Sequence, residues 1–296
     1  MDSEGLRTFV AIRRAGGFSA AAEQLGRSQP AISRRIALLE AELGAPLFER
    51  VAGGAVLSQA GTVLLPHAER VLASLKDAAD AVGALGRGHA GPLSIAAVGT
   101  LAASNLTAVL KRFTASFPEV DLSLRTATSD EVSDLVRRGE VTIGLRYYDD
   151  PSPDIAGRSL APEPLTVVCA ADHELAGRAV SSLRDLRDQH WLAFPRDYAR
   201  REASAETLFA QFLIRDAPDI RWTPVDSLTA QKRLIEAGFG VSLMPENSIA
   251  EERAAKTLAS IAVDDLDIAI PVTAIVRKDG YLSAASLGLI KLLTAG

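Results

Sequence analysis

The chain has 296 residues, of which 48% are apolar, 23% charged and 5% aromatic, and its net charge at pH 7 is −5. This composition is typical of a globular protein, and the length favours two or more compact units. The negative charge argues against nonspecific binding of nucleic acid through overall charge, so any such contact must come from a local, shaped unit.

Several other classes of protein are disfavoured by the same inspection. No apolar run approaches the roughly 20 residues that cross a bilayer, and the opening "MDSEGLRTFVAIRRAGG" lacks the pattern of an export signal, so we expect a cytoplasmic protein. Cys169 is the only cysteine, which excludes an internal disulfide and favours a buried structural thiol. The four histidines show no metal-ligand spacing, and we expect neither a metal nor a cofactor.

The first 58 residues predict short helices joined by glycines. Apolar residues at helical spacing within residues 6–13 predict a first helix that ends at residues 16–17. Ser19 is expected to cap a second, short helix, "AAAEQL", which ends at Gly26. These 58 residues carry seven arginines and six acidic residues, so phosphate contacts would rest on a few arginines.

A third helix follows, with Ser28 as its cap and Pro30 tolerated in the first turn. One face is predicted to be buried, and its apolar residues recur at spacings of four, three and four: Ile32, Ile36, Leu39 and Leu43. Arg34 lies on the opposite face, and Arg35 lies near the edge of the buried stripe. Such a helix suits the major groove of DNA. An ordinary helical bundle with a solvated arginine is the alternative.

The segment "PLFERVAGGAVLS" predicts a strand, a turn at residues 53–54 and a second strand, which together form a wing. With this hairpin, "FSAAAEQLGRSQPAISRRIALLEAELGAPLFER" and the following "LSQAG" resemble the winged helix-turn-helix of LysR-type transcriptional regulators over residues 3–62. The residues expected to contact DNA are Ser28, Gln29, Pro30, Ala31, Ser33, Arg34 and Arg50.

Two departures from the family pattern limit what the resemblance implies. Arg34 and Arg35 stand where the family often has a polar residue followed by Gln or a basic residue, so the base preference does not carry over. The wing tip "AGGA" lacks the basic residues of many members, and only Arg50 precedes it, so we expect weaker minor-groove contact.

A long helix is predicted from Ser58, with a bend or restart at Pro66. Its apolar residues alternate at spacings of four and three, as in a heptad seam: Leu64, Ala68, Val71, Leu75, Ala78, Val82 and Leu85. The following "GRGHAGP" is typical of a linker. We therefore predict a homodimer through residues 59–86; packing of the helix on its own domain is the alternative. The resemblance implies a tetramer.

Beyond Pro92, strand and helix patterns alternate and predict a parallel sheet wrapped by helices, followed by a second α/β series. The resemblance implies a two-lobed α/β effector domain like a periplasmic binding protein, with a cleft between lobes linked near 147–162 and 262–270. The expected divisions are 1–58 for the all-α winged helix-turn-helix, 59–91 for the dimerisation helix and hinge, 92–296 for the effector domain, about 92–161 and 268–296 for lobe I, and about 162–267 for lobe II.

Ligands of open α/β sheets bind beyond the carboxyl ends of the strands, and family members line their clefts at matching positions. The residues expected to bind an effector are Gly99, Thr100, Leu101, Thr128, Ser129, Arg146, Phe194, Pro195, Arg196, Leu228 and Thr229. Hydroxyls, helix starts and arginines favour a small carboxylate-bearing molecule. The alternatives are that the hydroxyls are helix caps, that Arg146 pairs with Asp149 or Asp150, and that residues 196–202 are a solvated helix start.

The predicted function is a sequence-specific transcriptional regulator that binds double-stranded promoter DNA under the control of this effector, with RNA polymerase as a further partner. The effector would shift the populations of two lobe arrangements, with Pro151, Pro153 and Pro271 near the hinges. The alternative is a solute-binding or enzymatic α/β domain with an accessory helical N-terminus. We expect no enzyme, because no serine elbow or phosphate loop is present and "GFGVSL" at 238–243 lacks the third glycine of a dinucleotide motif.

Overall fold

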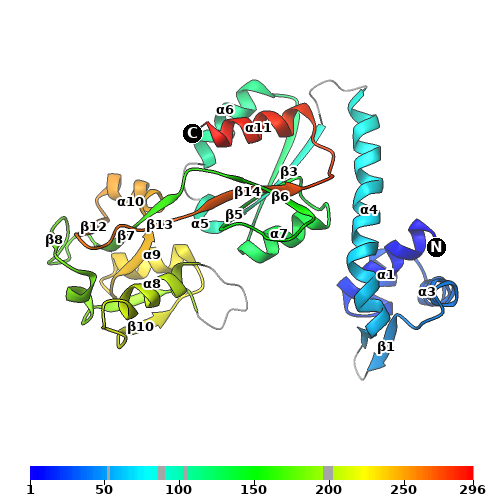
Figure 1. The fold of residues 1–296 in the computed structure, drawn as a ribbon, viewed down its shortest axis with the longest axis horizontal. Coiled ribbons are helices and arrows are strands. Elements are labelled where there is room, and N and C mark those ends of the chain that lie inside the picture. The colour runs from blue at the N-terminus through cyan, green and yellow to red at the C-terminus, as the bar shows by residue number, and fades with distance from the viewer. Residues whose placement is uncertain (52–53, 86–90, 103–105, 196–202, 296) are drawn as a thin grey trace. The chain divides into compact units, whose positions relative to one another are not determined.

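The structure is a computed structural model that describes residues 1–51, 54–85, 91–102, 106–195 and 203–295. Residues 1–86 belong to one compact unit, and residues 87–136 and 141–296 to another. The elements of the first unit are α1 (Ser3–Ala15), α2 (Phe18–Gln24), α3 (Gln29–Leu43), β1 (Phe48–Val51), β2 (Gly54–Leu57) and α4 (Gln59–Leu85) (Figure 1).

The N-terminal helices enclose a small apolar core. Its largest members are Leu6, Phe9, Ile12, Ile32, Ile36, Leu39, Leu47 and Phe48. The helix α1 begins at an Asp2 cap, whose Oδ1 accepts a hydrogen bond from Gly5 N at 2.7 Å, and ends at Gly16 with φ 76°. A residue with a positive φ is usually glycine, because a Cβ is crowded there. The predicted first helix is therefore confirmed.

The start of α2 differs from the prediction. The helix begins at Phe18, and Gly17 rather than Ser19 occupies the cap position, so the predicted Ser19 cap is wrong. The Phe18 ring packs edge-on against Phe48 with centroids 5.6 Å apart. This aromatic contact draws the first turn onto the core and places Ser19 inside the helix.

The helix α3 buries most of its predicted stripe. Ile32, Ile36 and Leu39 are at most 3% exposed, but Leu43 is 42% exposed and its predicted burial is wrong. Leu43 is the last residue of α3, where Gly44 with φ 69° turns the chain toward the wing. Ser28 is the N-cap residue, although its side chain makes no cap hydrogen bond.

The wing is a two-stranded antiparallel sheet, as predicted. Its register runs from Phe48 opposite Leu57 to Val51 opposite Gly54. The helix α3 and the wing are tied by Glu40, whose Oε1 accepts a hydrogen bond from Leu47 N at 2.7 Å. The predicted turn lies partly in residues 52–53, outside the described residues.

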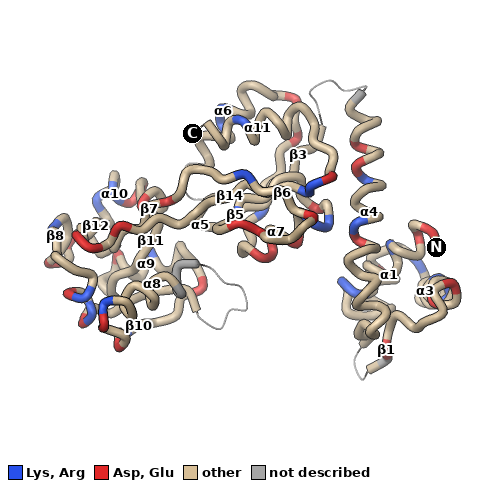
Figure 2. Tube along the Cα trace, viewed as in Figure 1, with Lys and Arg blue, Asp and Glu red and all other residues tan. Residues whose placement is uncertain are grey.

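The helix α4 runs without interruption from Gln59 to Leu85, so the restart considered at Pro66 does not occur. Ser58 sits at its start, accepting a hydrogen bond from Gly61 N at 3.0 Å. Most of α4 consists of uncharged residues, and short stretches of acidic and basic residues lie between them (Figure 2). No helix within the described residues is long and apolar enough to span a membrane.

The second unit contains two main sheets. The first has the order β4-β3-β5-β14-β6, in which β3, β4 and β5 are parallel, and this confirms the predicted βαβαβ arrangement. Helices α6 and α11 cover one face and α7 the other (Figure 1). The bounds are β3 (Gly91–Val98), α5 (Gly99–Ala102), α6 (Leu106–Ser116), β4 (Val120–Ala127), α7 (Ser129–Arg137), β5 (Ile143–Tyr147), β6 (Ile155–Ser159), β14 (Val272–Arg277) and α11 (Ala284–Thr294).

The second sheet has the order β11-β7-β12-β8, with β13 paired to β7, and a parallel pair of β9 and β10 lies beside it. Trp191 on β9 is fully buried against Phe212 of α8. The bounds are β7 (Glu163–Ala170), β8 (Ala179–Val180), β9 (His190–Ala193), α8 (Ala203–Leu213), β10 (Arg221–Pro224), α9 (Leu228–Glu236), β11 (Ser242–Pro245), α10 (Ala250–Ala255), β12 (Leu258–Val263) and β13 (Ala269–Ile270), with 3-10 turns at Leu183–Leu186 and Glu246–Ile249.

Two crossing segments join these sheets, and they pair with each other. Between Ser159 and Glu163 the chain passes from the first sheet to the second, and it returns at Pro271 between β13 and β14. Glu163 lies opposite Ile270 in an antiparallel register. The run "IAIPVTAIVR" therefore contains two strands, β13 and β14, on either side of Pro271. Pro151 and Pro153 lie between β5 and β6 of a single sheet, so their predicted place near a hinge is wrong.

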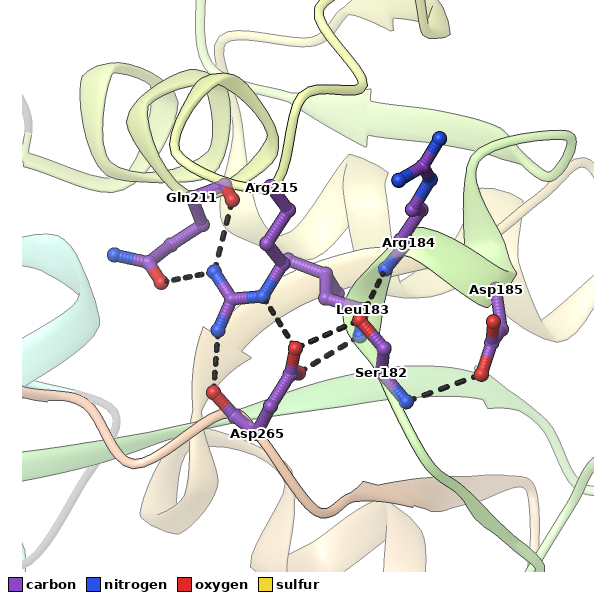
Figure 3. A network of polar contacts seen from close by, with 7 residues as sticks. All are labelled: Ser182, Leu183, Arg184, Asp185, Gln211, Arg215 and Asp265. Atoms are coloured by element: carbon purple, nitrogen blue, oxygen red, sulfur yellow. Dashed lines mark hydrogen bonds and ion pairs between the residues drawn. The ribbon is translucent and has the colours of Figure 1, made fainter.

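A polar network fixes the segment that leads into β13 (Figure 3). Asp265 accepts hydrogen bonds from Ser182 Oγ at 2.7 Å and Leu183 N at 2.9 Å, and its Oδ2 lies 2.7 Å from Arg215 Nε. Arg215 also donates to the backbone carbonyl of Asp265 and to Gln211. One carboxylate therefore joins the end of α8, the turn at Leu183 and the chain that follows β12.

Candidate functional sites

The N-terminal end of α3 forms an exposed polar surface. The positions Ser28 to Ala31 are exposed, and Ser33 is half-buried. Gln29 Nε2 donates a hydrogen bond to Ser33 Oγ at 3.0 Å, which links two side chains one turn apart. Arg50, the remaining predicted contact, lies on β1 opposite Ala55.

The two adjacent arginines of α3 have different surroundings. Arg35 is half-buried and its NH1 lies 2.9 Å from Asp2 Oδ2, on the carboxylate that also caps α1. Arg34 is exposed and, among the described residues, has no ion pair or hydrogen bond. The Arg35 charge is therefore engaged within the unit, whereas the Arg34 charge remains available to an anionic partner.

The first sheet brings several of the predicted ligand residues to one edge. The carboxyl ends of β3, β4 and β5 lie together because the strands are parallel. Thr100 follows β3 and Ser129 follows β4, and both contact Tyr147 at the end of β5. Tyr147 Oη lies 2.7 Å from Thr100 Oγ1, and Tyr147 N donates to Ser129 Oγ at 3.3 Å.

Glu163 completes this cluster, although no pattern in the sequence indicated a role for this residue. Its Oε2 lies 2.8 Å from Tyr147 Oη. Thr100, Tyr147 and Glu163 are 6%, 4% and 6% exposed, so the three side chains form a buried polar group. An acidic residue before an apolar strand ordinarily indicates a solvated strand end. Only the pairing of the crossing segments places Glu163 beside β5.

Arg146 is engaged in an ion pair. Its NH1 lies 3.1 Å from Asp150 Oδ2 and donates to Ser133 Oγ at 3.0 Å. Burial alone would raise the pKa of Asp150, but hydrogen bonds from Ser133 and Ser152 and the Arg146 charge hold that pKa below its usual value. The geometry matches the alternative in which Arg146 balances a neighbouring acid.

Thr128 and Glu131 cap α7 reciprocally. Thr128 N and Oγ1 both donate to Glu131 Oε2, at 3.0 and 3.1 Å, and Glu131 N lies 3.4 Å from Thr128 Oγ1. This is a capping-box arrangement. The start of α7 thus already carries a carboxylate of its own chain.

The remaining described ligand candidates lie in α5, directly after β9 and in the first turn of α9. Gly99 and Leu101 lie in α5, and Leu101 is buried. Phe194 and Pro195 follow β9 and are half-buried. Leu228 is half-buried and Thr229 exposed in the first turn of α9, where Ser227 Oγ accepts a hydrogen bond from Ala230 N at 3.4 Å. Arg196 lies outside the described residues.

Cys169 is fully buried in β7, with Sγ 3.7 Å from the Ala259 carbonyl oxygen. Burial, aided by the charge of Asp172, raises the pKa of its thiol to about 11, so it is not a thiolate at neutral pH. Within the described part of the chain, no cluster of His, Cys, Asp and Glu has the geometry of a metal site.

Two family models match the chain. A model described as "Bacterial regulatory helix-turn-helix protein, lysR family" matches residues 3–62, and one described as "LysR substrate binding domain" matches residues 86–296. Together they cover the N-terminal helices with the wing and the whole of the second unit.

Curated transcriptional regulators are similar to this chain over nearly its full length. The HTH-type transcriptional regulator CbbR of Rhodospirillum rubrum is 30% identical over 292 residues, covering 98% of this chain and 95% of that protein. TfdS of Cupriavidus pinatubonensis is 31% identical over 274 residues, covering 92% and 91%. A crystal structure of full-length CbnR complexed with its target DNA has a TM-score of 0.69 at 29% identity and covers 99% of each chain.

Proposed function

The chain belongs to the LysR family of bacterial helix-turn-helix transcriptional regulators, and from that membership we propose how its own residues carry out regulation. It is a DNA-binding transcriptional regulator with a two-lobed effector-binding domain, and members of this family are not enzymes. Residues 3–62 match the helix-turn-helix model of the LysR family, and this argues against a solute-binding protein or an enzyme with an accessory N-terminus. Because its partner is DNA, we propose that the protein acts in the cytoplasm.

The DNA contacts assigned by this proposal come from α3 and the wing. The observation that carries it is the contrast between Arg34, exposed and without an intramolecular partner in the described chain, and Arg35, held by Asp2. Arg34 reads a base edge in the major groove, and arginine is suited to this because it can donate two hydrogen bonds to guanine. Ser28, Gln29, Pro30, Ala31 and Ser33 flank it. Arg50 of the wing, whose side chain lies outside the described part of the structure, is proposed to contact the minor groove of DNA.

Arg34→Ala tests this assignment. The operator is first defined by selecting bound sequences from random DNA, and affinities are then measured by fluorescence anisotropy for the selected and a scrambled duplex. The variant should lose roughly 1–3 kcal/mol of discrimination. Arg158→Ala removes an exposed arginine from β6 of the other unit and should retain wild-type discrimination. Unchanged discrimination in Arg34→Ala would show that Arg34 does not read bases.

The effector is proposed to bind at the carboxyl ends of the strands in the second unit, between the residue groups of the two lobes. Lobe I contributes Gly99, Thr100, Leu101, Thr128, Ser129 and Arg146, and lobe II contributes Phe194, Pro195, Arg196, Leu228 and Thr229. A carboxylate group on the effector is proposed to bind at the first turn of α9, where Leu228 and Thr229 contribute backbone amides at the positive end of the helix dipole. The occupied start of α7 and the Arg146–Asp150 pair make those positions weaker carboxylate anchors.

A thermal-shift screen of small organic acids on the full chain, followed by DNA-binding measurements, tests the effector proposal. An acid that stabilises the chain should also change its affinity for the operator by coupling of about 1–3 kcal/mol. If every acid leaves both quantities unchanged, the carboxylate-bearing effector is excluded.

The family membership and the order of the elements also support a proposal for the domain boundaries and the oligomer. We propose domain divisions at 1–58, 59–91 and 92–296, with lobe I at about 92–161 and 268–296 and lobe II at about 162–267. The start of α4 at Gln59 and the two separate sheets of the second unit support these divisions. We assign dimerisation to residues 59–86 and place a tetramer on promoter DNA, where RNA polymerase is a further partner. The family membership and the exposed seam of α4 support this assembly.

A further inference from the structure

The side chain of Tyr147 is fixed to the first sheet. Tyr147 is buried on β5, and its backbone pairs with Val272 of β14 in the same sheet. Tyr147 N donates to Ser129 Oγ at 3.3 Å, and Tyr147 Oη lies 2.7 Å from Thr100 Oγ1. These partners lie on β14, α7 and α5, which all belong to the first sheet or follow its strands. The phenol hydroxyl is therefore held in place relative to lobe I.

The carboxyl group that meets this hydroxyl belongs to the second sheet. Glu163 is the first residue of β7, is buried, and pairs with Ile270 of β13. We call the segments 160–165 and 268–272 the ribbon, because both crossings between the two sheets lie within them. The backbone of Glu163 is thus part of the ribbon and moves with it.

One hydrogen bond joins these two parts of the molecule. Glu163 Oε2 lies 2.8 Å from Tyr147 Oη, an ordinary separation for a hydrogen bond between two oxygen atoms. A tyrosine hydroxyl can donate or accept, so this bond forms in either protonation state of Glu163. Because both residues are buried, water does not readily replace the bond once it is lost.

We propose that the hydrogen bond between Tyr147 and Glu163 is a latch that holds the ribbon against the first sheet and limits flexing between the lobes. Flexing of the ribbon turns β7 relative to β5, and the bond joins these two strands from side chain to side chain. A movement that separates the two oxygen atoms by about 1 Å more would break it. The latch therefore stabilises one arrangement of the lobes, whichever molecule binds between them.

Amide hydrogen exchange of the full chain, followed by mass spectrometry, tests the latch. Exchange from the ribbon, in which Leu165 N donates to Ile268 O at 3.0 Å, reports its opening. Tyr147→Phe removes the hydroxyl and keeps the ring. It should speed exchange of the ribbon peptides by about tenfold, the scale of one buried hydrogen bond. Tyr148→Phe makes the same change in the exposed neighbouring residue and should leave ribbon exchange unchanged.

The far end of β7 separates a latch from general destabilisation. Ala171, directly after β7, donates its N–H to the carbonyl oxygen of Thr257 at 3.1 Å. Peptides that cover this end of the strand should exchange at the wild-type rate in Tyr147→Phe. Unchanged exchange of the ribbon, or an equal increase at both ends of β7, would overturn the proposal.

Two variants of Glu163 assign the effect to this bond. Glu163→Gln keeps a hydrogen-bonding group of the same reach and should keep slow exchange of the ribbon. Glu163→Leu removes that group and should speed exchange at least as much as Tyr147→Phe does. Adding Tyr147→Phe to Glu163→Leu should speed exchange no further, because the bond is already absent. A further increase in the double variant would show that the two residues act separately, which contradicts a latch.

The distance between the lobes gives a second readout. Spin labels at Lys111→Cys on α6 and Asp188→Cys lie at exposed positions in lobes I and II, and the buried Cys169 stays in place. Labelled chain is diluted with unlabelled chain, so that an oligomer carries at most one labelled pair. Pulsed electron paramagnetic resonance should give a broader distance distribution for Tyr147→Phe than for the wild type or Tyr148→Phe. Equal widths in all three proteins would rule out the latch.

Discussion

Asp2 joins two parts of the N-terminal unit through one carboxylate. Its Oδ1 accepts from Gly5 N at the start of α1, and its Oδ2 binds Arg35 on α3. The cap satisfies an amide that has no partner within the helix. The ion pair fixes the neighbour of Arg34, so an element remote from the proposed DNA contact helps to hold the helix that makes it.

Two substitutions at Asp2 separate the cap from the ion pair. Asp2→Ala removes both and should lower the free energy of unfolding by about 1–2 kcal/mol. Asn is as good a cap as Asp but has no charge, so Asp2→Asn should lose only the pair, about 0–1 kcal/mol. Urea unfolding followed by circular dichroism measures both. Equal losses in the two variants would show that the cap contributes nothing.

Asp265 predicts a pH dependence of stability. Burial alone raises the pKa of Asp265, but hydrogen bonds from Arg215, Ser182 and Leu183 N, with the Arg215 charge, hold it below its ordinary value. The folded state therefore binds this proton less readily than the unfolded state. Its stabilisation is complete above the unfolded-state pKa of about 4 and is lost as the pH falls through the lower folded-state pKa.

Asp265→Asn should remove that contribution. The difference in the free energy of unfolding between wild type and variant should be about 1 kcal/mol at pH 7 and should shrink as the pH falls below about 4. Trp191 and Trp222, the two tryptophans, lie in β9 and β10 of the same unit, so their fluorescence in urea reports its unfolding. Asp188→Asn, a carboxylate 90% exposed, is the control. A pH-independent difference at Asp265 would contradict the argument.

At this scale the sequence predicted which side chains face the core better than it predicted their polar partners. Ile32, Ile36 and Leu39 follow a helical period, which is a local property. Leu43 has the same period, but its burial depends on what lies beyond the helix end. Glu163 meets Tyr147 only through the crossing of the two sheets, and no local pattern encodes such a contact.

The helix α4 changes character along its length. Ala68 is buried in the N-terminal core and Leu64 packs against it, whereas Val71, Leu75 and Val82 are 43%, 44% and 70% exposed. The predicted seam therefore packs on its own unit at the start and leaves its later positions uncovered by this chain. Exposed apolar residues at heptad spacing are stabilised when a second helix covers them.

Leu75→Glu tests that seam. A charge at its centre should convert the wild-type oligomer to a smaller species, because a carboxylate cannot be buried between two helices without a partner. Light scattering after size-exclusion chromatography gives the mass. Val63→Glu places the same charge at a position of α4 that is 64% exposed and lies off the seam, so it should leave the mass unchanged. A Leu75→Glu protein with wild-type mass would rule out this interface.

Elements with strong periods were predicted well, and short or interrupted ones were missed. The strands β3, β5 and β7 are continuous apolar runs and were recognised, as were the amphipathic α6 and α7. The strand β6, "IAGRS", has a glycine in its middle and an exposed second half. It therefore lacks the alternation of apolar and polar residues that would have predicted a strand paired with β14. The helix α10 has six residues and buries none of them.

For the whole molecule, the proposed dimer implies a fixed separation between two copies of α3. Half-sites read by a rigid dimer must lie on one face of the duplex, about one helical turn of 10–10.5 bp or a multiple of it apart. Inserting about 5 bp between the half-sites should lower affinity by tenfold or more, because the linked second contact is lost, and inserting about 10 bp should restore part of it.

Anisotropy titrations with the three duplexes measure this dependence, and a scrambled duplex sets the nonspecific background. Equal affinities for the 5 bp and 10 bp insertions would mean that the reading units are not held in phase. The order of the two domains was predictable because each has its own composition and period, whereas their spacing on DNA belongs to the assembly and is absent from any single segment.

The pairing of β7 with β13 has a mechanical consequence. If the two strands between the lobes were unpaired, the lobes could rotate about either strand. Instead, Glu163 pairs with Ile270 and Pro164 with Ala269 in an antiparallel register. A ribbon of this kind bends across its width and resists shear between its edges, because sliding would break the ladder. We therefore expect the lobes to move relative to each other by flexing of this ribbon, and not by sliding of one crossing segment past the other.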